Sequence, residues 1–206
     1  MFIPKCILSI FALTAQEPTR YAINGVQFSR DKNGRAQAVA TNGHTLIQVK
    51  WDEKPQSGYS LRTATVEKFT TIMPRTLVNW LSTLAEQALL EEGDNPKKIN
   101  IETFADFTNP TGTVITFPAI TTAFPHVNDV IPTYEIVTPG ENEIRAVRFL
   151  VTPQLLREVL ATISKCSPGD TGVELIVPLN PNKPLMLKRH TDSCDVVSVV
   201  MPRSSL

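Results

Sequence analysis

The sequence predicts an α+β protein in which helices pack against antiparallel sheets. A helical apolar pattern followed by short runs of period-two alternation occurs three times, at about residues 1–53, 70–125 and 145–203. Turn residues separate the short runs, so neighbouring strands are expected to be antiparallel. Helices gathered on one face of such sheets are typical of the α+β class. The repeat is one of pattern, since the three units share no close sequence identity.

The first unit begins with a short apolar segment that has two interpretations. Residues 1–16 contain an apolar run from Cys6 to Leu13, Pro4 suits the first turn of a helix, and Pro18 would close it. The same segment loosely resembles a secretory signal, because a lysine precedes the apolar run and small residues follow it. The run is too short to span a bilayer, which needs about 20 residues. We favour the amphipathic helix.

Three strands are predicted after this helix. They are RYAINGVQFS (20–29), RAQAVAT (35–41) and HTLIQVKW (44–51), with an Asp-Lys-Asn-Gly turn between the first two. Residues 52–68 are polar and indicate a linker.

The second unit opens with an amphipathic helix in residues 71–90. One stripe of this helix carries Leu77, Leu81, Leu84 and Ala88. Pro74 suits its first turn, and a Gly-Asp-Asn-Pro turn at 93–96 follows it. The strand-like runs KKINIETF (97–104) and TGTVITFPAI (111–120) complete the unit.

The third unit has the same order. Thr152 is the expected N-cap and Pro153 the first residue of a helix that continues through QLLREVLATISK. Three strands are then predicted in GVELIVP (172–178), PLMLKRH (184–190) and CDVVSVVM (194–201).

Composition narrows the function classes only slightly. Twenty basic residues balance twenty acidic ones, so any contact with DNA must come from a local arrangement of charge. Cys6, Cys166 and Cys194 are odd in number and form no Cys-x-x-Cys pair, which argues against a disulfide framework or a zinc site. This cysteine usage suits a reducing cytoplasm.

Signals for catalysis are weak. Residues 170–172 read Asp-Thr-Gly, the short signature of retroviral-type aspartic proteases, but the position is also that of an ordinary turn between a helix and a strand. His44, His126 and His190 lack metal-ligand spacing, and no nucleophile and base pair can be named. We expect a protein that is not an enzyme and needs no metal or cofactor, with the protease as a distant alternative.

Five segments, in order along the chain, resemble the bacterial DNA sliding clamp, the β subunit of DNA polymerase III. They are RYAINGVQFS with AVATNGHTLIQV (20–29 and 38–49), MPRTLVNWL (73–81), the turn at 93–96, FPHVNDVIP (124–132) and VVSVVMPR (196–203). The resemblance implies the DNA clamp fold, with a complete clamp-like domain in 1–126, a connecting segment in 127–144 and half a clamp-like domain in 145–206. It also implies that the first domain of the family and the first half of its last domain have no counterpart here.

The resemblance further implies a pocket that binds short hydrophobic peptides. The positions that match this pocket are Ile23, Thr41, Gly43, His44, Leu46, Pro125, Val130, Val199, Met201 and Pro202. Thr45 and Asp129 stand where the family commonly has basic residues, so the selectivity for partners is expected to differ. Each position also has an ordinary structural interpretation, since Asn42-Gly43 is a strong hairpin signal anywhere and residues 199–201 would be core strand by default.

The same comparison predicts only a weak DNA-binding surface. Its candidates are Lys5, Arg75, Arg157 and Lys165. Against them stand Glu86, Glu91 and Glu92 towards the end of the second predicted helix and Glu158 on the third. The resemblance implies a processivity or accessory factor of DNA replication or repair that binds clamp-binding peptides of the polymerase, the clamp loader or repair proteins. The alternative is a regulator or decoy that binds such partners without encircling double-stranded DNA. We expect the protein to lie in the cytoplasm and to make no membrane contact. We also expect a homo-oligomer, because unpaired strand edges invite pairing with another chain.

Overall fold

The computed structural model describes residues 1–16, 23–53, 59–63, 70–74, 104–108, 114–118, 124–135, 149–169 and 172–203. Its helical elements are the 3₁₀ helix η1 (Lys5–Leu13), α2 (Val127–Val130) and α3 (Pro153–Cys166). Its strands are β1 (Phe2–Ile3), β2 (Gly25–Arg30), β3 (Ala36–Thr41), β4 (Thr45–Trp51), β5 (Tyr59–Thr63), β6 (Thr70–Pro74), β7 (Phe104–Thr108), β8 (Val114–Pro118), β9 (Glu174–Ile176), β10 (Leu185–His190) and β11 (Cys194–Val200). The α+β prediction is confirmed.

A seven-stranded antiparallel sheet forms the centre of the structure. Its strand order is β6-β2-β3-β4-β11-β10-β9, and a second sheet has the order β1-β5-β7-β8. Strands β4 and β11 join the first unit to the third, in a register that runs from Trp51 opposite Cys194 to Thr45 opposite Val200. The order of elements is therefore repeated on the two sides of this junction, with η1-β2-β3-β4 on one side and α3-β9-β10-β11 on the other.

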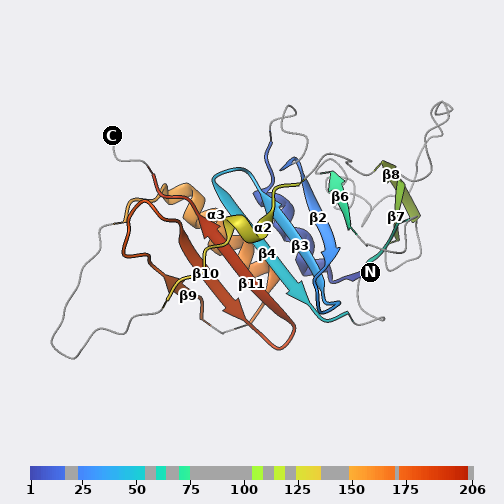
Figure 1. The fold of residues 1–206 in the computed structure, drawn as a ribbon. Helices are drawn as coiled ribbons and strands as arrows, with labels where there is room; N and C mark the ends of the chain where they lie inside the picture. Colours follow the sequence, from blue (N-terminus) through green and yellow to red (C-terminus); the bar gives the residue numbers. More distant parts are fainter. Residues whose placement is uncertain are drawn as a thin grey trace.

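The inner face of this sheet carries the main core. Side chains alternate between the two faces of a strand, so Ile47, Val49 and Trp51 of β4 all point to the same side. They are buried in one cluster with Val196 and Val200 of β11. Helices η1 and α3 cover this face and pack against each other (Figure 1). The first segment of the chain is thus part of the core, as the helix interpretation requires, and its residues Ile7, Ile10 and Leu13 are almost fully buried.

The outer face carries a smaller cluster under α2. Val39 of β3, Leu46 of β4 and Val199 of β11 are buried together with Phe124. The side chains of Val127 and Ile131, one at the start of α2 and the other just after it, pack against them. Figure 1 shows α2 crossing the front of the sheet, on the side opposite to α3. We call this group the outer cluster.

A network of charged groups links the first and third units near the N-terminal end of β11, away from the outer cluster. Arg35 donates hydrogen bonds to Asp195 at 2.6 Å and to Asp52 at 2.9 Å, and His190 also contacts the carboxylate of Asp195. Burial by itself would raise the pKa of Asp195, but the hydrogen bonds from Arg35 and His190 outweigh it and lower that pKa below its usual value. The charged form of Asp195 therefore stabilises the fold.

Most predicted strands agree with the structure, and the differences have simple causes. Strands β3, β4, β9, β10 and β11 lie within the predicted runs, and β2 extends one residue beyond its run, to Arg30. Helix α3 begins at Pro153 after Thr152 as expected. The predicted linker 52–68 is wrong in part, since it contains β5, whose pairing partners β1 and β7 are distant in the sequence. Strand β7 starts at the last residue of the run 97–104 and extends beyond it. The helix predicted in 71–90 lies outside the described residues from position 75 onward, and Thr70–Pro74 form β6.

Within the described part of the chain, no helix has the length and apolar character needed to cross a membrane.

We expect Asp195→Asn to lower the free energy of unfolding by about 1 kcal/mol at pH 7, because it removes the charged partner of Arg35. The folded-state pKa of Asp195 is depressed, so its contribution is present above the unfolded-state pKa of about 3.9 and is lost as the pH falls through the folded-state value. Urea denaturation of both proteins between pH 7 and pH 3 should show the difference shrinking at low pH. Asp192→Asn in the neighbouring turn is the control, and a difference that stays constant with pH would contradict this account.

We expect Leu46→Ala to destabilise the protein by about 2–4 kcal/mol, because Leu46 is 2% exposed in the outer cluster and its loss leaves a cavity. Met201→Ala removes an apolar side chain that is 42% exposed and should change stability by less than about 0.5 kcal/mol. Urea denaturation measures both changes in the free energy of unfolding. Equal losses for the two variants would contradict the distinction between a buried Leu46 and an exposed Met201.

Candidate functional site

The predicted peptide-binding residues converge at one end of β3, β4 and β11. Leu46 lies opposite Thr41 on one side and opposite Val199 on the other. Beyond the last ladder pair, the backbone N–H of Met201 donates a hydrogen bond of 2.9 Å to the carbonyl of His44. Residues more than 150 positions apart in the chain are therefore neighbours here.

The turn between β3 and β4 is held by its own side chains. The Oδ1 atom of Asn42 accepts hydrogen bonds from the backbone of His44 at 2.9 Å and of Thr45 at 2.8 Å. The hydroxyl of Thr41 donates to the carbonyl of Thr45 at 2.7 Å and accepts from the N–H of Gly43 at 3.1 Å. Gly43 has φ of 89°, a conformation that favours glycine. The turn is thus a fixed platform that presents His44 to solvent.

Exposure divides the predicted residues into a covered floor and an accessible rim. Thr41, Leu46 and Val199 are buried, and Leu46 and Val199 belong to the outer cluster under α2. Met201 and Val130 are large apolar side chains with exposed fractions of 42% and 36%. The remaining accessible members are Gly43, His44 and Pro125, which are exposed, and Pro202, which is half-buried. A ligand at this surface would meet the rim residues directly.

Ile23, Thr45 and Asp129 differ from the floor and rim residues in their position or role. Ile23 is half-buried two residues before β2, where its carbonyl accepts a hydrogen bond of 2.9 Å from the N–H of Ala15. Thr45 is 2% exposed and bonds to Asn42, so it stabilises the turn and does not reach the rim. Asp129 on α2 is exposed and adds a negative charge close to Val130.

The sequence analysis missed the residues that cover the floor. Phe124, Val127 and Ile131 form that cover together, and all three lie in the segment FPHVNDVIP. Their spacing of three and four residues is that of one helical face, which was the signal available in the sequence. Val39 was missed as well, because alternation within β3 does not say which face meets α2.

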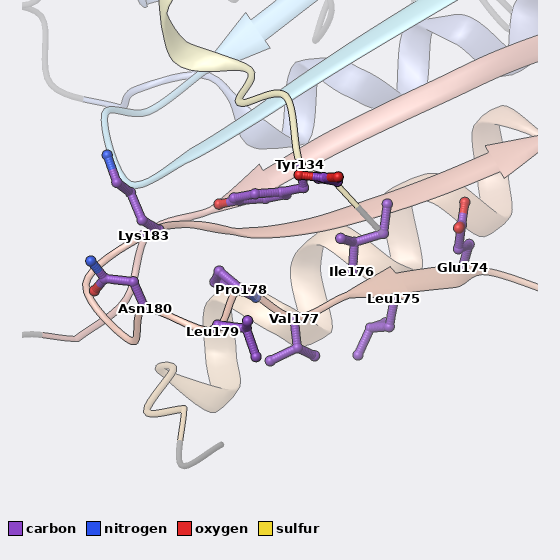
Figure 2. Close-up of a pocket in the computed structure, with 10 residues that line it drawn as sticks. Tyr134, Glu174, Leu175, Ile176, Val177, Pro178, Leu179, Asn180 and Lys183 are labelled. Carbon is purple, nitrogen blue, oxygen red and sulfur yellow. The ribbon is translucent and has the colours of Figure 1, made fainter. Parts of the chain in front are cut away.

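Two cavities lined by described residues lie elsewhere. A cavity of about 430 Å³ lies between Tyr134 and the segment from Glu174 to Asn180, with Lys183 at its edge (Figure 2). A second, of about 330 Å³, is lined by Lys188, His190 and Asp195 among others. Neither of these two cavities is lined by a predicted peptide-binding residue.

The DNA-binding candidates are sparse. Arg157 and Lys165 are exposed on α3, and the Nη2 atom of Arg157 donates to Gln154 at 2.7 Å. Lys5 begins η1, and Arg75 lies outside the described residues. With Glu158 included, the charged residues of α3 sum to a single positive charge.

The described residues do not bring metal-ligating side chains together. They contain no group of three or more His, Cys, Asp or Glu side chains placed to hold a metal ion. Burial raises the pKa of Cys166 to about 12, so its thiol is not a nucleophile at neutral pH. Asp170 and Thr171 of the Asp-Thr-Gly string lie outside the described residues.

Comparisons with known proteins place the fold. No protein-family model matches the sequence, and no curated protein matches it. Among solved structures, the Helicobacter pylori β clamp in complex with diflunisal superposes with a TM-score of 0.67 at 14% identity, over 99% of this chain and 64% of that one. The Pseudomonas aeruginosa sliding clamp gives a TM-score of 0.66 at 18% identity, over 100% and 66%. The H. pylori clamp bound to a DNA ligase peptide gives 0.65 at 14% identity, over 97% and 62%.

At these identities the likeness shows the fold, and the chain spans less than two thirds of the length of these clamps. This chain has the α+β fold of bacterial β sliding clamps, as its sequence resemblance predicted.

Proposed function

We propose that the chain is a clamp-like accessory factor of DNA replication or repair, which binds short peptides of its partner proteins at the rim formed by His44, Pro125, Val130, Met201 and Pro202. The observation that carries this proposal is the junction of β4 and β11, which places Met201 beside His44. This junction unites two distant parts of the chain to which the resemblance assigned one peptide site, and α2, with its neighbours Phe124 and Ile131, packs on the same outer cluster. The proposed role is that of a binding protein in the cytoplasm, with no chemistry of its own.

The physical character of the rim suits an apolar peptide. Met201 and Val130 expose apolar surface, and methionine adapts its shape to different partners. The backbone of the turn at 42–45 is fixed by its internal hydrogen bonds, so binding needs little ordering of the protein there. The peptide would contribute two or three apolar anchors.

The class of partner follows from the clamp likeness. One of the similar structures is a clamp bound to a DNA ligase peptide. By extension, the partners of this chain are the clamp-binding peptides of DNA polymerase, the clamp loader or repair proteins. The exposed carboxylate of Asp129 would disfavour peptides that carry an acidic residue next to the anchor contacting Val130.

Fluorescence anisotropy of a labelled clamp-binding peptide tests the proposal. We expect the wild type to bind and the double variant Val130→Lys, Met201→Ala to bind at least about tenfold more weakly, because it removes both exposed apolar contacts. Leu175→Lys is the matched control, since it changes an exposed apolar residue on β9 and should leave the affinity unchanged. Absence of wild-type binding at high micromolar protein would refute the proposed function.

A second candidate function, a regulator that occupies these peptides without encircling DNA, is favoured by the sparse charge of α3. Nonspecific affinity for DNA depends on the number of phosphates that lysine and arginine neutralise. The described part of α3 offers Arg157 and Lys165, and Glu158 opposes them. This regulator would use the same peptide site as the accessory factor, but it would not encircle DNA.

Binding to a labelled DNA duplex at physiological salt, followed by a salt titration, separates the two candidates. The regulator predicts an affinity no better than the usual nonspecific range of about 10⁻⁴ to 10⁻⁶ M, with little effect of Arg157→Ala combined with Lys165→Ala. Tighter, strongly salt-dependent binding that the double variant loses would favour the factor that encircles DNA.

A further inference from the structure

Two side chains of opposite charge stand next to the rim residues of the proposed peptide site. Asp129 precedes Val130 on α2, and Arg203 follows Pro202 after β11. Both side chains are exposed. No other residue directly before or after a rim residue in the sequence is an Asp, Glu, Lys or Arg. The apolar rim is therefore bordered by one negative and one positive charge.

The backbone that carries Arg203 is held in place at two points. The N–H of Met201 donates a hydrogen bond of 2.9 Å to the carbonyl of His44, and the N–H of Arg203 donates one of 2.9 Å to the carbonyl of Leu150. In Figure 1 the chain beyond β11 leads away from α2. The negative charge on α2 and the positive charge after β11 thus mark different ends of the rim.

Ion pairs use the charges at the far end of the sheet, but not these two. At the far end Arg35 bonds to Asp195, and the Nζ atom of Lys50 lies 3.3 Å from a carboxylate oxygen of Asp31. Within the described part of the chain, no ion pair joins the carboxylate of Asp129 or the guanidinium of Arg203 to another residue. A ligand can meet either charge without breaking an ion pair with a described residue.

We propose that Asp129 and Arg203 determine which peptides the rim selects and which way they lie. The preferred peptide carries a basic residue on the α2 side of its apolar anchors and an acidic residue on the other side. This inference rests on the proposed peptide-binding function and adds the charge pattern of the ligand. Complementary charges favour one partner and like charges disfavour another, so a peptide lying the wrong way round is penalised at both ends. The apolar anchors supply most of the affinity, because exposed ion pairs contribute little.

Three labelled peptides with the same apolar anchors test this pattern by fluorescence anisotropy with the full-length chain. One has lysine before the anchors and glutamate after them, the second has these two exchanged, and the third has glutamine at both places. At about 0.05 M salt we expect one charged peptide to bind about tenfold more tightly than the other, with the glutamine peptide between them. Equal affinities for all three would overturn the inference and leave the proposed function standing. Absence of any binding would remove the proposed function and this inference with it.

Charge reversal assigns the preference to the two residues. The double variant Asp129→Lys, Arg203→Glu keeps the net charge and should prefer the other charged peptide by a similar factor. Its affinity for the glutamine peptide should equal that of the wild type, which shows that the site is folded. The matched control Lys32→Glu, Asp192→Lys reverses two exposed charges in the turns before β3 and β11, and it should keep the wild-type preference. An unchanged preference in the first double variant would overturn the assignment.

A salt titration separates charge from packing. The Debye length falls to about 3 Å at about 1 M salt, so the preference between the two charged peptides should drop from about tenfold to less than about twofold. The glutamine peptide should bind at least as tightly at high salt as at low salt, since apolar contacts are not screened. A tenfold preference that persists at about 1 M salt would overturn the inference, because it would come from the shape of the flanking side chains.

Discussion

The pairing of β4 with β11 is the interaction on which the rest of the structure depends. Seven residues of the first unit form a continuous antiparallel ladder with seven residues of the third. The Ser198 hydroxyl adds a hydrogen bond of 2.8 Å to the carbonyl of Leu46, across 152 positions of sequence. Closing so long a loop costs entropy, which the ladder and the two apolar faces together must offset. Without this junction η1 and α3 would have no common sheet to cover, and Arg35 could not reach Asp195.

The strands at this junction have an inner face that carries the main core and an outer face that carries the outer cluster. Because successive side chains of a strand point to opposite faces, the same seven positions of β4 supply both the main core and the outer cluster. The inner face is stabilised by large buried side chains such as Trp51 and Phe28. Among the described residues, α2 and the segment after it lie over the outer face, and Val130 and Met201 expose apolar surface there. The candidate binding surface is therefore a consequence of a short helix lying over a wide sheet.

The sequence predicted the strands of the first and third units well, because each contains a clear alternation bounded by turn residues. It did not predict β5, whose residues lie in a polar stretch and whose partners come from distant segments. The resemblance to clamps identified the members of the candidate site but not their roles. Leu46 and Val199 prove to be buried, Thr45 supports a turn, and Phe124 and Val127, which were not predicted, cover the floor.

The sequence by itself determined the fold class, the order of most elements and the identity of the hairpin turn at Asn42 and Gly43, because periodicity and turn chemistry are local properties. Only the tertiary structure decided that the first and third units share one sheet and which face of each strand is covered. These outcomes depend on contacts between segments far apart in the chain, and a strand's alternation is the same whichever neighbour it pairs with. For that reason the exposed row at Leu175, Val177 and Leu179 could not be distinguished from a core strand until the position of α3 was known.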